Sequence, residues 1–182
     1  LRGGDALVQL VEVEPGFRTM PTAVFYRADG PPHAEPEREY GRAAVAAYVD
    51  GLDGRLMRSM KSILGSTLVE QTTDVGGGRG MRYIDVVAGY LRHLKGLAEA
   101  AADGPIEHVV MGRPVFFVDD EPERDAQAQA ALESAARSAG FADVRFQYEP
   151  IAAALDHERT VQRDWEKARM VLHRALGDGA LA

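Results

Sequence analysis

The sequence predicts an α/β protein in which a mixed sheet is flanked by helices. From residue 82 onward the pattern reads helix, strand, helix, strand, helix, an order typical of parallel strands joined by right-handed crossovers. Two runs within the first 28 residues predict further strands: residues 6–14, which are rich in Val and Leu, and residues 22–28. The length of 182 residues is enough for one domain with a substantial core and too small for two large domains.

The composition is that of an ordinary globular protein and narrows the range of partners. Hydrophobic residues make up 46% of the chain, charged residues 27%, and the formal net charge is −7. Because contacts with phosphates need a concentrated positive face, this charge disfavours nucleic acid as a partner. The absence of cysteine excludes a disulfide framework and a Cys-type zinc site, and it favours a cytoplasmic setting. No apolar run approaches the ~20 residues that span a bilayer, so a membrane partner is not expected.

The N-terminal part of the chain is predicted to contain a β-hairpin followed by a short helix. Residues 6–14 and 22–28 are strand-like runs, close enough in sequence to pair with each other. Residues 31–39 are rich in proline and charge and predict a loop. Residues 40–51 predict a short helix with Gly51 just past its end.

The middle of the chain contains the clearest helix of the sequence. Residues 55–65 are basic and ambiguous, and residues 66–81 predict a polar, glycine-rich loop. Apolar residues then recur at steps of three and four over residues 82–104, which predicts a long amphipathic helix.

The C-terminal part alternates between strands and helices. Residues 106–117 and 143–149 predict strands, and residues 122–140 between them predict an alanine-rich helix. Two further helices are predicted at residues 150–162 and 164–179. This order places Glu149 where a strand passes into a helix, the position at which open α/β sheets hold their ligand sites. The positive end of the following helix dipole favours an ionised carboxylate there, although a simple helix cap is an alternative role for Glu149.

Two other features of the sequence are weak candidates for a site. The stretch "DVGGGRG" (residues 74–80) imitates a phosphate-binding loop, but it lacks Gly-Lys-Ser/Thr and follows the polar run "VEQTT". We therefore expect it to be a flexible loop. The five histidines show neither an i, i+4 pair nor an HExxH motif, so no metal site is predicted from them.

Several short motifs occur in an order that resembles a known family. "GRPVFF", an alanine-rich helix ending in "AGF", a strand and "YEPIAAALDHE" resemble one block of the heat shock protein 70 family, the DnaK-type molecular chaperones. Upstream, "RTMPTAVFY", "YGRAAV" and "MKSILG" resemble further segments of that family in the same order. The Gly-Arg-Pro variant is similar to that of shorter, divergent bacterial chaperone-like members. The resemblance covers residues 7–158.

The resemblance implies an actin-like, ribonuclease H-like ATPase fold, in which two lobes hold a nucleotide between them. Residues 1–163 would then form part of lobe I. Within it, residues 1–28 and 105–163 would form the core subdomain, and residues 29–104 a smaller inserted α/β subdomain. Residues 164–182 would be a C-terminal helix from a later part of the parent protein.

The resemblance also implies a chaperone that hydrolyses ATP and couples lobe movement to the binding of unfolded clients or co-chaperones. The cofactor would be ATP or ADP with Mg²⁺. Glu149 would link the metal and its water shell to the lobe interface, and Lys61 would face the γ-phosphate, where a cation stabilises the transferring group. Pro114 would relay the nucleotide state to the lobe surface. The alternative role for Lys61 is that of a solvated lysine in a basic segment with Arg55 and Arg58. The alternative for Pro114 is that of an ordinary proline at the end of a strand.

The sequence also departs from the family pattern. The two phosphate loops, Asp-x-Gly-Thr and Asp-x-Gly-Gly-Gly-Thr, and the adenosine-binding Gly-Gly motif are not found in the printed sequence. Ala128 stands near the position of a family arginine that faces the linker, which argues against conventional coupling to a substrate-binding domain. We therefore expect a fragment or truncated form that is inactive as an ATPase by itself. The rival hypotheses are a non-catalytic interaction module derived from such a lobe, and another actin-like ATPase such as a filament protein or sugar kinase.

Overall fold

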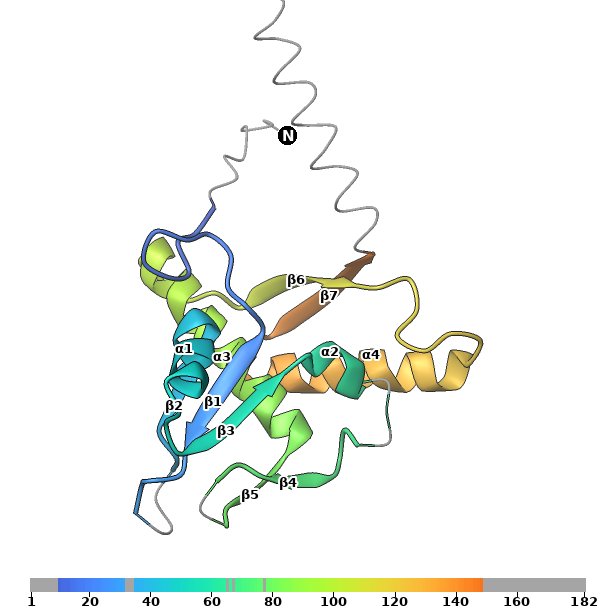
Figure 1. The fold of residues 1–182 in the computed structure, drawn as a ribbon. Helices are drawn as coiled ribbons and strands as arrows, with labels where there is room; N and C mark the ends of the chain where they lie inside the picture. Colours follow the sequence, from blue (N-terminus) through green and yellow to red (C-terminus); the bar gives the residue numbers. More distant parts are fainter. Residues whose placement is uncertain (1–9, 32–34, 65, 67, 77, 149–182) are drawn as a thin grey trace, which may run out of the picture. The chain divides into compact units, whose positions relative to one another are not determined.

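The structure is a computed structural model that describes residues 10–148 apart from residues 32–34, 65, 67 and 77 (Figure 1). It is a mixed α/β structure with small sheets and flanking helices, which confirms the predicted class. The chain divides into two compact units. Of the described residues, the first unit contains 10–109 and 116–144, and the second contains 110–115 and 145–148.

The first unit is built around a three-stranded antiparallel sheet of strand order β2-β1-β3. The strands are β1 (Ala23–Arg27), β2 (Arg38–Tyr40) and β3 (Gly54–Arg58). The central strand β1 is almost wholly buried, and helix α1 (Gly41–Val49) packs on one face of the sheet (Figure 1). Side chains of the sheet and the helix form a shared hydrophobic core, whose buried members are Ala23, Phe25, Ala44 and Ala47. Burial of this apolar surface stabilises the unit.

The expected hairpin between residues 6–14 and 22–28 is wrong for the described residues. Residues 10–14 form no strand, and only an isolated bridge joins Glu14 to Phe17. The reason lies in β1, which pairs with β2 along one edge and with β3 along the other. Both edges of β1 are therefore occupied by strands that come later in the sequence.

The predicted short helix is confirmed, and the ambiguous run that follows divides into two elements. Helix α1 ends at Val49, and Gly51 just beyond it has a left-handed φ of 73°. The ambiguous run forms β3 and the short helix α2 (Met60–Leu64), which packs against the two long helices of the unit. Ser59 alone joins β3 to α2 and has a left-handed φ of 59°.

The two long helices α3 (Tyr83–Ala102) and α4 (Pro122–Ser138) are confirmed and pack against each other. In the predicted apolar stripe of α3, Ile84 and Val87 are buried, whereas Leu91, Leu94 and Leu97 are half-buried. The buried side chains of α4 are Ala128, Leu132, Ala135 and Ala136. Helix α3 is preceded by a hairpin of β4 (Thr72–Asp74) and β5 (Gly80–Arg82). Within the described ranges, no helix combines the length and the apolar character needed to cross a bilayer.

A second pair of strands consists of β6 (His108–Arg113) and β7 (Asp143–Tyr148), and helix α4 lies between them in sequence. The backbone N–H groups of Ala142 and Asp143 donate to the carbonyl oxygen of Glu107 at 2.8 and 3.0 Å. Because the two paired strands begin side by side, they run parallel. The predicted strand–helix–strand unit with parallel strands is therefore confirmed.

Candidate functional site

The site predicted from the sequence centres on the carboxyl ends of β6 and β7. Arg113, the last residue of β6, is buried, and its Nε donates to the carbonyl oxygen of Pro114 at 3.0 Å. Its Nη2 donates to the carbonyl oxygen of Val115 at 3.2 Å. The guanidinium carbon lies 5.3 Å from the centroid of the Tyr148 ring, at the end of β7. Arg113 therefore ties the segment after β6 to the end of β7.

Through Arg113, this arrangement links Pro114, a predicted site residue, to Tyr148, which directly precedes the predicted site residue Glu149. Pro114 is half-buried directly after β6, and Tyr148 is the residue that precedes Glu149. Glu149 itself lies outside the described residues, so its metal-linking role stays a prediction. The carboxyl ends of neighbouring parallel strands are where open α/β sheets place ligand sites. Sequence reasoning missed Arg113, and the only signal for it was an arginine next to a proline at a predicted strand end.

Lys61 is the second residue of α2, in the first compact unit, whereas Pro114 belongs to the second. Helix α2 is held in place by Met60 and Leu64, which are 3% and 4% exposed. The structure describes the backbone of Lys61 and not its side chain, so the direction of its ammonium group stays a prediction.

The glycine-rich stretch at residues 74–80 is the connection of a hairpin. Val75, Gly76, Gly78 and Arg79 belong to neither strand, so the predicted loop is confirmed for these residues. The polar run before it is nevertheless a strand, because Thr72, Thr73 and Asp74 form β4 and pair with β5. The turn between the strands uses its own backbone donors. Val75 N donates to Arg79 O at 2.8 Å, Gly76 N to Asp74 Oδ1 at 2.8 Å and Arg79 N to Gly76 O at 3.2 Å. These three N–H groups are therefore not available to bind a phosphate.

Arg79 fixes this turn to the end of strand β1. Its Nη2 donates to the carbonyl oxygen of Arg27 at 2.6 Å, and its Nε donates to that of Gly76 at 3.1 Å. A longer contact of 3.4 Å joins Nη1 to the carbonyl oxygen of Pro31. These contacts of Arg79 give the glycine-rich stretch a structural role in the first unit.

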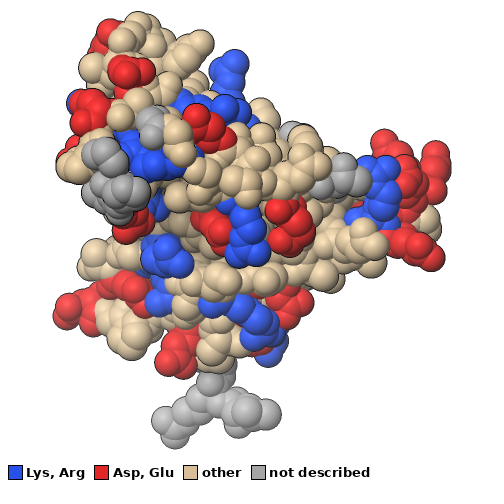
Figure 2. Space-filling model, turned by 90° about the horizontal axis from the view of Figure 1, so that it is seen from below, with Lys and Arg blue, Asp and Glu red and all other residues tan. Residues whose placement is uncertain are grey.

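The electrostatics of the described residues give little sign of a metal or polyanion site. They contain no group of three or more His, Asp or Glu side chains arranged to hold a metal ion. Figure 2 shows Lys and Arg side chains interspersed with Asp and Glu over the face that it presents. Burial raises the pKa of Tyr26 to about 12 and lowers the pKa of His93. Tyr26 lies in β1 and His93 in α3, away in sequence from the two strand ends.

Comparison with known proteins agrees with the motifs seen in the sequence. Residues 8–181 match the Hsp70 protein family. A chaperone protein HscA homolog from Aromatoleum aromaticum is 32% identical in an alignment of length 158 that covers 78% of this chain and 23% of that protein. The chain thus spans about a quarter of the length of this curated relative. Because the family match extends over nearly all of the printed sequence, the chain belongs to the Hsp70 family.

Proposed function

We propose that this chain is part of lobe I of an actin-like ATPase domain, in a parent chaperone that uses ATP to drive lobe movement and client binding. The observation that carries the proposal is the family match over residues 8–181. The parallel strands β6 and β7, whose ends meet at Arg113, supply the strand-end geometry that such a site needs.

The proposed subdomains follow the sheets of the structure. Strand β1 pairs with β2 and β3, so we assign it, together with residues 29–104, to the smaller inserted subdomain. The segment before β1 and residues 105–163 would belong to the core subdomain. This division moves the first boundary from residue 28 to the start of β1.

The residues proposed to meet the nucleotide are Lys61 and Glu149, with Pro114 responding to its presence. The N–H groups of Val75, Gly76 and Arg79 in the glycine-rich turn are already bonded within the turn, so they are not available to hold phosphates. ATP and Mg²⁺ would therefore be held by these side chains together with groups from the rest of the parent protein. When bound, Mg²⁺ would neutralise phosphate charge, and the Lys61 ammonium would stabilise the charge on the transferring phosphoryl group.

The test is steady-state ATP hydrolysis by the parent protein with Lys61→Ala and with Arg58→Ala. We expect Lys61→Ala to lower kcat by about a hundredfold or more, the scale of losing one charge-stabilising group in a transition state. Arg58→Ala removes a neighbouring exposed cation of the same basic run and should leave kcat within about twofold. Equal effects of the two variants would show that Lys61 is an ordinary surface lysine.

The two phosphate-loop motifs are not found in the printed sequence, and this observation favours a second candidate function. That candidate is a non-catalytic interaction module derived from the same lobe. The heat of ATP binding to the parent protein, measured by calorimetry, distinguishes the ATPase from the interaction module. Measurable heat that is lost in Glu149→Gln supports the ATPase, and the absence of heat supports the interaction module.

A further inference from the structure

A pocket with a volume of about 570 Å³ lies in the first unit, far in sequence from the strand ends described above. Its wall is formed by residues 13–20 of the N-terminal segment, strand β2, and helices α1 and α3. This volume is in the range of ~300–1,000 Å³ typical of sites for small molecules. The apolar residues of the wall are Val13, Pro15, Phe17, Met20, Ala43 and Leu97. Because the wall belongs to one compact unit, the pocket does not depend on the proposed ATPase function.

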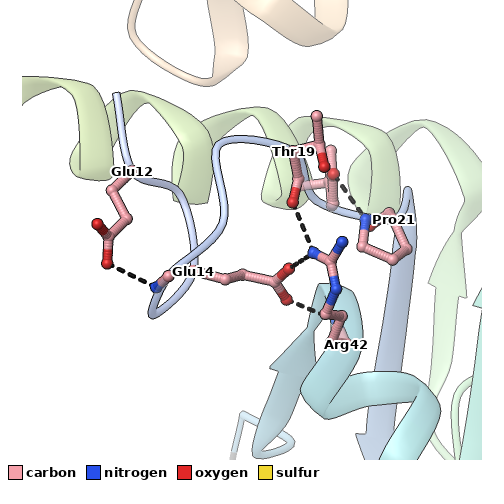
Figure 3. Close-up of polar contacts among 7 residues, drawn as sticks. Glu12, Glu14, Thr19, Pro21 and Arg42 are labelled. Carbon is pink, nitrogen blue, oxygen red and sulfur yellow. Dashed lines mark hydrogen bonds and ion pairs between the residues drawn. The ribbon is translucent and has the colours of Figure 1, made fainter. Parts of the chain in front are cut away.

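Arg42 joins the N-terminal segment to α1 on one side of the pocket (Figure 3). The carboxylate of Glu14 accepts a hydrogen bond from the backbone N of Arg42 at 2.6 Å and forms an ion pair with the Arg42 guanidinium. Arg42 Nη1 also donates to the carbonyl oxygen of Thr19 at 2.6 Å, and its guanidinium carbon lies 3.9 Å from the centroid of the Phe17 ring. These contacts hold the N-terminal segment over α1, and the two charges of the ion pair balance each other.

The other two charged side chains of the wall also have oppositely charged neighbours. Arg38 forms an ion pair with Glu35. Glu39 lies on the opposite face of strand β2 from Tyr40, because successive side chains of a strand alternate, and it interacts electrostatically with Arg27. Each charge of the wall is thus already balanced within the protein. A charged ligand would have to compete with one of these contacts.

His93 supplies a neutral hydrogen-bonding group at the wall of the pocket. Its ring is half-buried and stacked on that of Tyr40, with the centroids 4.0 Å apart and the planes at 6°. Burial lowers the pKa of the imidazole and outweighs the opposite effect of the Glu14 carboxylate, so the ring is uncharged at neutral pH.

Both ring nitrogens of His93 are open to a ligand. Among the described residues, no hydrogen bond involves either nitrogen. The described ranges also contain no buried side-chain nitrogen or oxygen that lacks a partner, so the two unbonded nitrogens are reached by solvent. In the neutral ring one nitrogen donates and the other accepts.

We propose that this pocket binds a small neutral molecule that has a flat apolar body and one hydroxyl group, and that the hydroxyl donates to the acceptor nitrogen of His93. The apolar residues of the wall remove the body of the ligand from water. The hydrogen bond to His93 selects the hydroxyl, because a purely apolar ligand cannot form it. Ligands with a net charge are disfavoured, because they would leave water without finding an unbalanced counter-charge.

The test compares four probes of similar size: phenol, toluene, benzoate and benzylammonium. Binding of each probe to the 182-residue chain near neutral pH is followed by the shifts of backbone amide signals in two-dimensional NMR. We expect phenol to shift the signals of pocket residues such as Ala43 and Leu97, and to bind about fivefold more tightly than toluene. Both ions should bind at least about fivefold more weakly than phenol.

Three outcomes would overturn the proposal. Toluene that binds as tightly as phenol would show that the hydroxyl makes no hydrogen bond. An ion that binds as tightly as phenol would show that the charges of the wall are open to ligands. Shifts confined to other parts of the chain would place the site elsewhere.

A variant assigns the preference for a hydroxyl to one side chain. His93→Phe keeps an aromatic ring beside Tyr40 and removes both nitrogens, so it should weaken phenol binding about fivefold and leave toluene within about twofold. His108→Phe is the matched control, since its side chain is 77% exposed and does not line the pocket. Phenol should also move the nitrogen-15 signal of the acceptor nitrogen of His93, and toluene should not. Equal losses of phenol binding in both variants would contradict the proposal.

Two further measurements cover misfolding and competing occupants. If His93→Phe does not fold, Phe17→Ala provides an independent variant, because Phe17 is 47% exposed and lines the pocket. It should weaken phenol and toluene together, and unchanged binding of both would overturn the assignment to this pocket. Sedimentation of the chain alone tests self-association. A dimer that phenol does not dissociate, and that blocks its binding, would mean that a second copy occupies the pocket in place of a small molecule.

Discussion

At the scale of single residues, Glu14 and Gly41 depend on each other. The carboxylate of Glu14 accepts from the backbone N of Arg42, in the first turn of α1, so it supplies a helix cap that Tyr40 does not provide. This approach is possible because Gly41 has no side chain. A Cβ at Gly41 would collide with Glu14 Oε1 and with Met20 Cγ, and would lie 2.8 Å from Met20 Sδ. The left-handed φ of 60° at Gly41 adds a second requirement for glycine.

The matched pair Gly41→Ala and Gly51→Ala separates the two requirements. Both glycines have left-handed backbones, at 60° and 73°, but a Cβ at Gly51 meets nothing within 4 Å. Gly51→Ala should lower the free energy of unfolding by about 1 kcal/mol, from backbone strain alone. Gly41→Ala should lower it by about 3 kcal/mol or more, because the collision is added. Urea denaturation measures both, and equal losses would show that Glu14 is not held against α1.

At the scale of secondary-structure elements, the sequence predicts the helices and strands that have a local sequence pattern. It misses the strands that form only because they pair with a distant segment. Helices α1, α3 and α4 follow from apolar periodicity and from glycine past a helix end, and β6 and β7 follow from their position around α4. The hairpin of β4 and β5 is polar, with Thr, Asp and Gly in its strands, so its stability comes from the ladder and from Arg79. Arg79 reaches the carbonyl of a residue 52 positions away, which no local pattern encodes.

The contacts of Arg79 lead to a prediction about the stability of the β4–β5 hairpin. Arg79→Ala removes charge-assisted hydrogen bonds to backbone carbonyls and should lower the free energy of unfolding by about 2 kcal/mol. Amide hydrogen exchange at Val75, whose N–H is bonded to the Arg79 carbonyl, should become faster. Arg82→Ala is the control, because its side chain is 53% exposed and forms surface ion pairs, so it should cost under about 1 kcal/mol. An Arg79→Ala protein with unchanged exchange at Val75 would contradict this account.

At the scale of the whole molecule, the sequence motifs identified the family, whereas the positions of the site side chains could not be deduced in full. The strand ends that flank Pro114 and precede Glu149 were predictable, because a parallel strand–helix–strand unit places them together. The contribution of Arg113 was not predictable, since it depends on burial beside Tyr148, which belongs to another strand. The pairing partners of β1 were missed for the same reason: antiparallel neighbours are selected by the complete sheet and not by nearness in sequence.

The departures from the family pattern lead to a prediction about ATP hydrolysis by the isolated chain. The printed 182-residue chain contains neither phosphate-loop motif, and it spans 23% of its HscA-like relative. We expect the isolated chain to hydrolyse ATP at least about a hundredfold more slowly than the parent protein, because transition-state stabilisation needs the missing groups. Phosphate release at saturating ATP measures both proteins. Comparable turnover would mean that the 182-residue chain holds a complete active site.

The cap that Glu14 provides for α1 also has a kinetic consequence. Helix α1 has nine residues, too few for a stable isolated helix in water, and its capping carboxylate lies 28 positions earlier in the chain. Closing a loop of that length costs about 3 kcal/mol of chain entropy before the contact is made. The first turn of α1 should therefore become ordered only when the polypeptide has already collapsed around β1, so that nascent chains ending shortly after residue 49 would lack this helix.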